Sequence, residues 1–315
     1  MMRLLGWLAL VAAFAQTPAM AASGDNRVET SRTQVVMLGT GTPIPDPDRS
    51  GPAVAVVVDD VAYLFDAGAG VVRRAAAAGR AGVKVFAPER PGGQPNPRFQ
   101  AIFITHLHSD HTLGLADAIF TPWIQGRAAP VDVYGPSGLA RLLKSIGEGY
   151  ADDIHVRTTD PGGPSPDGWR AVAHEVDPGV VYRDERITVR AFAVQHVEGL
   201  HAYGYRIDTP DRTIVISGDT RQSEAVASAC DGCDLLIHEV LSDTAFRAYP
   251  PERQPYHAAA HTLATQVGEV ATRARAKLLV LTHVIANGVP DAVVLDEVRS
   301  TFKGQVVLAH DLDVL

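Results

Sequence analysis

The stretch with the highest density of chemically versatile side chains is ITHLHSDHTLG, where His106, His108, Asp110 and His111 fall close together. In an extended chain alternate side chains point the same way, so His106 and His108 would project from one face of the strand that the preceding AIFI predicts. A turn would then bring His111 round as ADAIF begins a helix. A polar turn with hydrogen-bonded histidines is the alternative. Because imidazoles and carboxylates are donors that zinc prefers, the cluster favours a metal site.

Further ligands are required, because this short cluster cannot complete the coordination of two metal ions. Three polar residues stand where apolar runs stop: His196 follows ITVRAFAVQ, Asp219 follows TIVISG, and His283 follows LLVLT. Residues at the ends of rigid strands are well placed to build a site. A lone histidine at a strand end is more often structural, but together with the cluster these three residues predict a complete ligand set.

The motifs THLHSDH, SGDT and LTH, in this order, resemble the metallo-β-lactamase superfamily of binuclear hydrolases. HAYGYRI, SGDTR, HEV and AHT resemble its ribonuclease Z-like branch, which also includes small phosphodiesterases and exported arylsulfatase-like hydrolases. The similarity runs from Gln34 to the end of the chain. It implies an α/β (α+β) fold, a four-layer αββα sandwich with metals at one edge of the paired sheets. Residues 22–315 would form this single domain.

The resemblance also assigns the metal ligands. One metal would be bound by His106, His108 and His196, the second by Asp110, His111 and His283, and Asp219 would bridge the two. Histidine and carboxylate donors suit two Zn²⁺ ions per chain, although manganese or iron would tolerate the same set. Relatives are often dimers, so a homodimer is a further expectation.

Two metals about 3.5–4 Å apart lower the pKa of a bridging water and so generate a metal-bridging hydroxide as the nucleophile. Asp110 would accept a hydrogen bond from this hydroxide and orient it. A leaving oxygen needs a proton, and His261 in HAAAHT is the candidate donor, with Glu239 in HEV as its orienting partner. A helix residue without chemistry is the alternative for His261. His257 shares the cleft in one interpretation, whereas His238 is expected in the core.

Other residues are weaker candidates for the substrate cleft. The segments 121–123 (TPW) and 158–168 are expected to line it. His201 lies five residues after His196 and is either a supporting residue or a substrate contact. No neighbouring motif indicates a functional role for three other histidines, His155, His174 and His310.

The expected substrate is a small anionic ester, either a phosphodiester or a sulfate ester. The intact SGDT opposes a β-lactamase, since β-lactam-cleaving members commonly lack this bridging aspartate. Long-form tRNA-processing members insert an arm before this strand, whereas YGYRIDTPDRTIVISGDT runs directly through a short turn. The formal net charge of −8 also disfavours a nucleic-acid partner. A tRNA 3′-end-processing endoribonuclease and a metal-loaded, non-catalytic binding protein remain as alternatives.

The first 21 residues predict a signal peptide. Arg3 precedes an apolar run over residues 4–15, and Ala19 and Ala21 give an A-x-A ending. The run is shorter than the roughly 20 residues that a spanning helix needs, so a membrane anchor is disfavoured. We therefore expect a periplasmic or secreted protein. Export would permit a disulfide between Cys230 and Cys233, and a pair of unreacted thiols is equally compatible.

The elements that must position these residues are short and alternate along the 315-residue chain, whose composition of 46% hydrophobic and 20% charged residues is ordinary for a globular protein. Apolar, β-branched runs predict strands at residues 35–38, 53–58, 61–65, 101–104, 131–134, 187–194, 213–217, 235–240, 278–281 and 305–309. Helical patterns cover residues 71–78, 138–146 and 262–275, and loops cover residues 42–52, 87–98 and 158–168. Their order suggests sheets packed face to face with helices outside.

Overall fold

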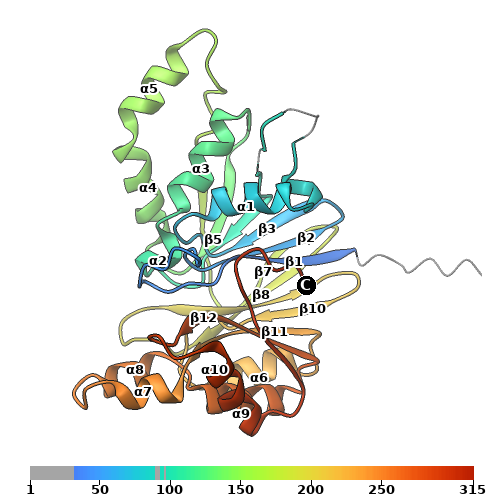
Figure 1. Cartoon of the computed structure of the whole chain (residues 1–315). Helices are drawn as coiled ribbons and strands as arrows, with labels where there is room; N and C mark the ends of the chain where they lie inside the picture. Colours follow the sequence, from blue (N-terminus) through green and yellow to red (C-terminus); the bar gives the residue numbers. More distant parts are fainter. Residues whose placement is uncertain (1–31, 89–92, 96) are drawn as a thin grey trace, which may run out of the picture. The chain divides into compact units, whose positions relative to one another are not determined.

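Two β-sheets pack against each other between outer layers of helices in the computed structural model, which describes residues 32–88, 93–95 and 97–315 (Figure 1). The helices α1 and α3 lie over one sheet, and α6, α9 and α10 lie over the other. This arrangement confirms the four-layer αββα sandwich. The predicted signal peptide lies outside the described residues, and among the described residues no helix is long and apolar enough to cross a membrane.

The two sheets have six and seven strands, and each is part parallel and part antiparallel. The first sheet has the order β1-β2-β3-β4-β5-β6, and its strands are β1 (Thr33–Gly39), β2 (Ala53–Val58), β3 (Val61–Phe65), β4 (Ala101–Phe103), β5 (Val131–Gly135) and β6 (Ala171–Glu175). The second has the order β13-β12-β11-β10-β9-β8-β7, and its strands are β7 (Gly179–Arg183), β8 (Thr188–Val194), β9 (Ala202–Asp208), β10 (Thr213–Ile216), β11 (Leu235–Leu241), β12 (Leu278–Ile285) and β13 (Gln305–Leu308).

Helices make the connections between the parallel strands. They are α1 (Val71–Arg80), the 3₁₀ turn η1 (Lys84–Phe86), α2 (Ser109–Thr112), α3 (Leu115–Ile124), α4 (Leu139–Gly149), α5 (Ala151–Thr159), α6 (Glu224–Cys230), α7 (Asp243–Ala248), α8 (Gln254–Ala260), α9 (Ala264–Ala274) and α10 (Asp291–Thr301). Most crossovers therefore cover the outer faces of the sheets, which leaves the strand ends free to carry side chains for a site.

Strand β2 shows why so much of the sequence is apolar. All six residues of AVAVVV are buried. Because side chains alternate along a strand, Val54, Val56 and Val58 pack between the sheets while Ala53 and Val57 pack under the helices of the first sheet. Both faces of the strand thus contribute to a core, and the usual alternation of apolar and polar residues disappears.

Several elements differ from the sequence-based expectation. Strands β6 and β7 lie at the edges of their sheets and are partly exposed, so their mixed composition gives no apolar run. Helix α5 includes Thr158 and Thr159, so the predicted loop at residues 158–168 begins too early. Helix α10 was also not predicted. The predicted loop at residues 87–98 lies partly outside the described residues.

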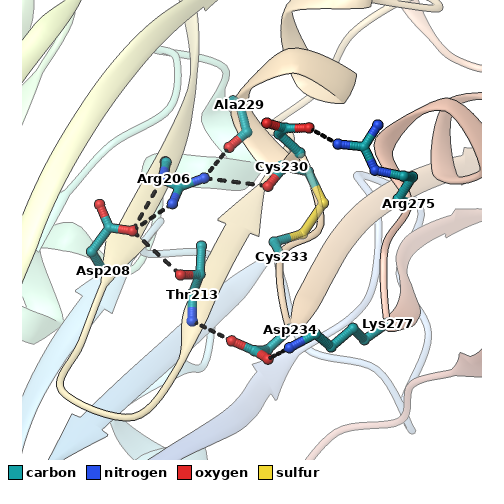
Figure 2. The surroundings of a disulfide bond; sticks show 10 residues. Arg206, Asp208, Thr213, Ala229, Cys230, Cys233, Asp234, Arg275 and Lys277 are labelled. Atoms are coloured by element: carbon teal, nitrogen blue, oxygen red, sulfur yellow. Dashed lines mark hydrogen bonds and ion pairs between the residues drawn. A yellow bond between two sulfur atoms is a disulfide. The ribbon is translucent and has the colours of Figure 1, made fainter.

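Cys230 and Cys233 form a disulfide, which settles the question that the sequence left open (Figure 2). The bond joins the end of α6 to the chain just before β11, and both cysteines are buried. Arg206 donates a hydrogen bond to the Cys230 carbonyl at 3.2 Å, and Asp234 pairs with Lys277 at 2.7 Å. The disulfide therefore closes a small loop that is held by polar contacts on either side.

Gly268 in α9 provides a test of the packing between α9 and α10. A Cβ atom at Gly268 would lie 2.5 Å from the carbonyl oxygen of Val298. Gly268→Ala should lower the free energy of unfolding by up to about 2 kcal/mol, because overpacking costs about 1–3 kcal/mol and the gain in helix propensity offsets about 1 kcal/mol of it. Gly147→Ala in α4 is the matched control, since its Cβ would meet only the Trp169 ring at 3.4 Å. Urea unfolding measures both, and equal stability of the two variants would contradict the packing described.

Candidate metal centre

The seven predicted ligands converge at one edge of the sandwich, although they come from distant parts of the chain. His106 and His108 follow β4, and α2 carries Asp110 and His111. From the second sheet, His196 follows β8, Asp219 follows β10, and His283 lies within β12. All of them are buried except His108, which is partly exposed. The structure therefore brings together residues from both sheets, as the carboxyl ends of neighbouring strands allow.

His106, His108 and His196 form the first triad. One ligand atom from each lies within 4.8 Å of the others. The Nε2 atom of His196 faces Nδ1 of His108 at 3.1 Å. On its other side, His196 Nδ1 donates a hydrogen bond to the Ala260 carbonyl at 2.7 Å. This bond fixes the tautomer in which Nε2 keeps its lone pair and points it into the cluster.

Asp110, His111 and His283 form the second triad, again with one ligand atom from each within 4.8 Å of the others. The Asp110 Oδ2 atom lies 3.2 Å from Nε2 of His283 and 3.5 Å from Nε2 of His111. His283 owes its position to a β-bulge. Glu239 pairs with Thr282 and Val240 with Val284, so His283 is the extra residue, and its φ of 44° is left-handed. A bulge re-aims a side chain and is often found beside active sites.

Asp219 lies between the two triads. Its Oδ1 is 3.4 Å from His111 Nε2, and its Oδ2 is 3.4 Å from His283 Nε2. The Oδ2 atom is also 3.9 Å from His106 Nε2 and 4.0 Å from His196 Nε2. The preceding Gly218 has φ 60°, and a Cβ there would lie 2.6 Å from the Tyr203 carbonyl oxygen. Only glycine therefore fits the turn that aims the Asp219 carboxylate at both triads.

The cluster combines strong burial with opposing charges. Burial lowers the pKa of His106 well below its usual value. Burial also lowers the pKa of His111, but the Asp219 and Asp66 carboxylates outweigh it and raise that pKa well above its usual value. For Asp219 burial raises the pKa, yet the imidazoles of His283 and His111 bring it well below the usual range. The imidazoles around Asp219 thus favour its ionised carboxylate despite its burial.

Several ligand atoms in this cluster have no hydrogen-bond partner among the described residues. His106 Nε2 and His111 Nε2 are both buried in this way. Buried polar atoms in native proteins are normally satisfied, so unpaired ring nitrogens that face one another and a carboxylate fit a bound cation. Nitrogen and carboxylate-oxygen donors are the set that zinc accepts. The residues present therefore match the metal site that the motifs indicate.

Asp66 supports both triads and was missed in the sequence. Its Oδ2 accepts a hydrogen bond from His111 Nδ1 at 2.8 Å and another from the Thr105 hydroxyl at 2.9 Å. The same hydroxyl lies 3.0 Å from His106 Nδ1 and can accept a hydrogen bond from it. Asp66 thus orients one ligand of each triad. It follows the apolar strand VAYLF, so the signal used for Asp219, a polar residue at a strand end, also marks Asp66.

His261 and Glu239 lie beside the ligand cluster, as expected. The Nδ1 atom of His261 is 3.4 Å from Glu239 Oε2, and the Oε1 atom of Glu239 accepts a hydrogen bond from the Thr262 amide at 2.8 Å. Burial lowers the pKa of His261, but the Glu239 carboxylate outweighs it and raises the pKa above its usual value. The His261 ring centroid is 5.2 Å from that of His196 and 5.8 Å from that of His283. The imidazole whose protonated form Glu239 favours therefore stands next to the two triads.

A pocket of about 500 Å³ opens above the cluster. It reaches five of the seven proposed ligands and His261 at its base. Its remaining walls come from the loop after β1, from the α7–α8 segment and from the end of β12. These wall residues are Thr42, Pro43, Ile44, Tyr249, Arg253, Tyr256, His257, Ile285 and Asn287. The ring of His257 stacks on Tyr249 with centroids 4.0 Å apart. His257 therefore does share the cleft.

Two expectations about the cleft are wrong. Residues 121–123 and 158–168 do not line this pocket. Trp123 lies in α3 and is buried in the core, where its Nε1 donates a hydrogen bond to the Ser165 carbonyl at 2.7 Å. His201 is exposed and lies outside the pocket. His238 is buried, as expected, and its Nδ1 donates to the Glu239 carbonyl at 2.7 Å. Trp123, which was expected in the cleft, is thus a residue of the hydrophobic core.

Comparisons with known proteins agree with this geometry. Residues 62–284 match the model of the β-lactamase superfamily domain. The chain is 30% identical over 258 residues to a ribonuclease Z of Mycobacterium bovis. The aligned region covers 80% of this chain and 86% of that protein.

Solved structures agree on the fold. The metallo-β-lactamase fold protein YhfI from Bacillus subtilis has a TM-score of 0.67 and 18% identity and covers 90% of this chain and all of its own. The short form of human tRNase Z has a TM-score of 0.64 and 24% identity. The superposition covers 90% of this chain and 98% of that structure. With its αββα sandwich and its cluster of histidines and aspartates at one sheet edge, the chain belongs to the β-lactamase superfamily and has the metallo-β-lactamase fold.

Proposed function

We propose that this protein is an exported, binuclear metal-dependent hydrolase of small phosphodiesters or sulfate esters. Two ligand triads that share Asp219 beneath an open pocket support this proposal. His106, His108 and His196 would hold one ion, and a second ion would be held by Asp110, His111 and His283. Zinc suits these donors best, and manganese or iron is compatible with them. Export is inferred from the sequence of residues 1–21.

When bound, two such cations supply Lewis acidity and lower the pKa of a water molecule between them. The chain itself contributes positioned acceptors and donors. Asp110 and Asp219 present carboxylate oxygens that face the same centre and can accept hydrogen bonds from the attacking water. Asp66 keeps His111 and, through Thr105, His106 in fixed orientations. This preorganisation means that little rearrangement is required when the substrate arrives.

His261 would donate the proton that the leaving oxygen needs. Its Nδ1 faces the Glu239 carboxylate, so Nε2 is the atom available to the pocket. The carboxylate raises the pKa of the imidazole and so favours its protonated form, which is the form that a general acid requires. Glu239 is itself fixed by the Thr262 amide, so the pair keeps one geometry. Glu239 thus acts through His261 as a positioning residue.

The size and charge of the pocket favour a small substrate. A volume of about 500 Å³ lies within the range of about 300–1,000 Å³ typical of small-molecule sites. Among the described residues that line it, Arg253 alone carries a fixed positive charge. A nucleic acid needs many such contacts along its backbone, and the net charge of −8 works against them.

Transfer-RNA processing is the second candidate, because the relatives that match at 30% identity are named ribonuclease Z. Strands β9 and β10 are joined by residues 209–212 alone, with a hydrogen bond from the Thr209 amide to the Arg212 carbonyl at 2.9 Å. This connection leaves no room for the arm that long-form tRNA-processing enzymes insert there. We therefore rank the small ester first.

Assay of the exported protein, whose first residue should be Ala22, would decide between these candidates. After loading with zinc, it should hydrolyse bis(p-nitrophenyl) phosphate or p-nitrophenyl sulfate and leave a precursor tRNA intact. The two esters distinguish phosphoryl from sulfuryl specificity. Cleavage of the tRNA with no turnover of either ester would establish the second candidate. Two bound metals without any turnover would indicate a binding protein and contradict the proposed hydrolase.

Variants of the ligands should lose metal and activity together. His108→Ala should leave about one zinc ion per chain, and Asp219→Ala should leave less, because Asp219 faces both triads. Each should lower kcat/KM by more than about 100-fold. Elemental analysis and ester hydrolysis provide the measurements, with circular dichroism to verify folding. His201→Ala, which changes an exposed histidine outside the pocket, is the control, and normal turnover by either ligand variant would refute the assignment.

His261→Ala should affect substrates according to their leaving groups. Loss of a general acid should lower kcat for a phenyl leaving group by about 10²–10⁴-fold. A p-nitrophenyl group leaves as a stable anion, so its kcat should fall much less. Zinc content should stay at the wild-type value, which separates this variant from the ligand variants. An equal loss on both leaving groups would show that His261 does not protonate the leaving oxygen.

A further inference from the structure

Helix α8 and the two residues that flank it present three basic residues to the pocket at intervals of four residues: Arg253, His257 and His261. Residues 254–260 are helical, and hydrogen bonds from the His257 amide to the Arg253 carbonyl and from the His261 amide to the His257 carbonyl join the two flanking residues to this helix. A helical rise of 1.5 Å per residue places the Cα atoms of Arg253 and His261 about 12 Å apart. Arg253 therefore lies at the outer part of the pocket, away from the proposed leaving-group acid.

No described residue neutralises the charge of Arg253. The side chain is exposed, and its guanidinium makes no hydrogen bond or ion pair with any described residue. The carboxylates that line the same pocket, Asp110 and Asp219, belong to the ligand cluster at its base. An arginine that lines a ligand pocket without an acidic partner is suited to bind an anion, since its planar fork matches carboxylate and phosphate oxygens.

The neighbours of Arg253 are aromatic and apolar. Tyr256 is 57% exposed and Ile44 is 60% exposed, although both line the pocket. His257 stacks on Tyr249, and burial lowers its pKa, with further lowering by His261 and Arg253. His257 is therefore neutral at neutral pH and belongs with the aromatic wall. The wall thus offers ring surfaces for an apolar group and one cation beyond them.

We infer that Arg253 determines specificity by binding a second anionic group of the substrate, at a distance from the ester that reacts. This inference rests on the proposed function and narrows it. The substrate would be an ester whose aromatic or apolar arm carries a carboxylate or phosphate. The reacting ester would sit at the ligand cluster, the arm would contact Tyr256 and Ile44, and the second charge would reach the guanidinium.

Two matched substrates test this inference: 4-nitrophenyl 4-carboxyphenyl phosphate and its carboxamide counterpart, which has the same shape without the second charge. The zinc-loaded wild-type protein should prefer the carboxylate by about tenfold in kcat/KM, the lower end of what a hydrogen bond to a charged group provides. In Arg253→Gln this ratio should fall to about one, mainly through KM. Arg253→Lys should keep part of the preference, because charge remains without the bidentate fork.

Arg73→Gln is the matched control, because Arg73 is an exposed arginine on α1 outside the pocket and its replacement changes the net charge equally. It should keep the tenfold ratio. Calorimetric titration with 4-carboxyphenylphosphonic acid and 4-carbamoylphenylphosphonic acid, which contain no ester bond to hydrolyse, should show the same order of affinities. Equal turnover of both substrates by the wild-type protein, or an unchanged preference in Arg253→Gln, would overturn the inference. Failure to hydrolyse either phosphodiester, together with no turnover of p-nitrophenyl sulfate, would instead contradict the proposed function.

Discussion

The desolvation of Asp219 is the constraint on which the rest of the structure depends. This carboxylate is only 3% exposed, and ring nitrogens of four histidines lie within 4.0 Å of its oxygens. Removing a carboxylate from water is costly unless positive charge compensates it. Those histidines come from both sheets, so the two sheets must keep a fixed spacing at this edge. The fully buried apolar layer between them provides that rigidity.

The backbone departs from regular geometry at the points where it delivers the site residues. Asp66, Gly218 and His283 all have left-handed φ values, of 58°, 60° and 44°. Non-glycine residues adopt this region at a cost, which is tolerated only where the surroundings hold them. Each of the three lies at or near the end of a buried strand. The rigid buried strands therefore stabilise the strained residues at their ends.

Residue type made the ligand cluster predictable, because few other roles explain three histidines and an aspartate in one turn. Asp66 carried a similar signal, but an aspartate before a glycine-rich segment is also an ordinary turn residue. Arg253 could not be predicted, since its importance depends on which walls meet in space. The mixed composition of β6 and β7 hid two edge strands, and Trp123 looked like a cleft residue although it packs in the core.

Each ligand triad draws on both sheets: His196 joins His106 and His108, and His283 joins Asp110 and His111. Ions held there would tie the N-terminal and C-terminal halves of the sandwich together at one edge, much as covalent cross-links do. A ligand that binds only the folded chain adds to its stability by mass action. The supply of metal in the surroundings would then govern how long the protein survives heat and proteases, as well as how fast it works.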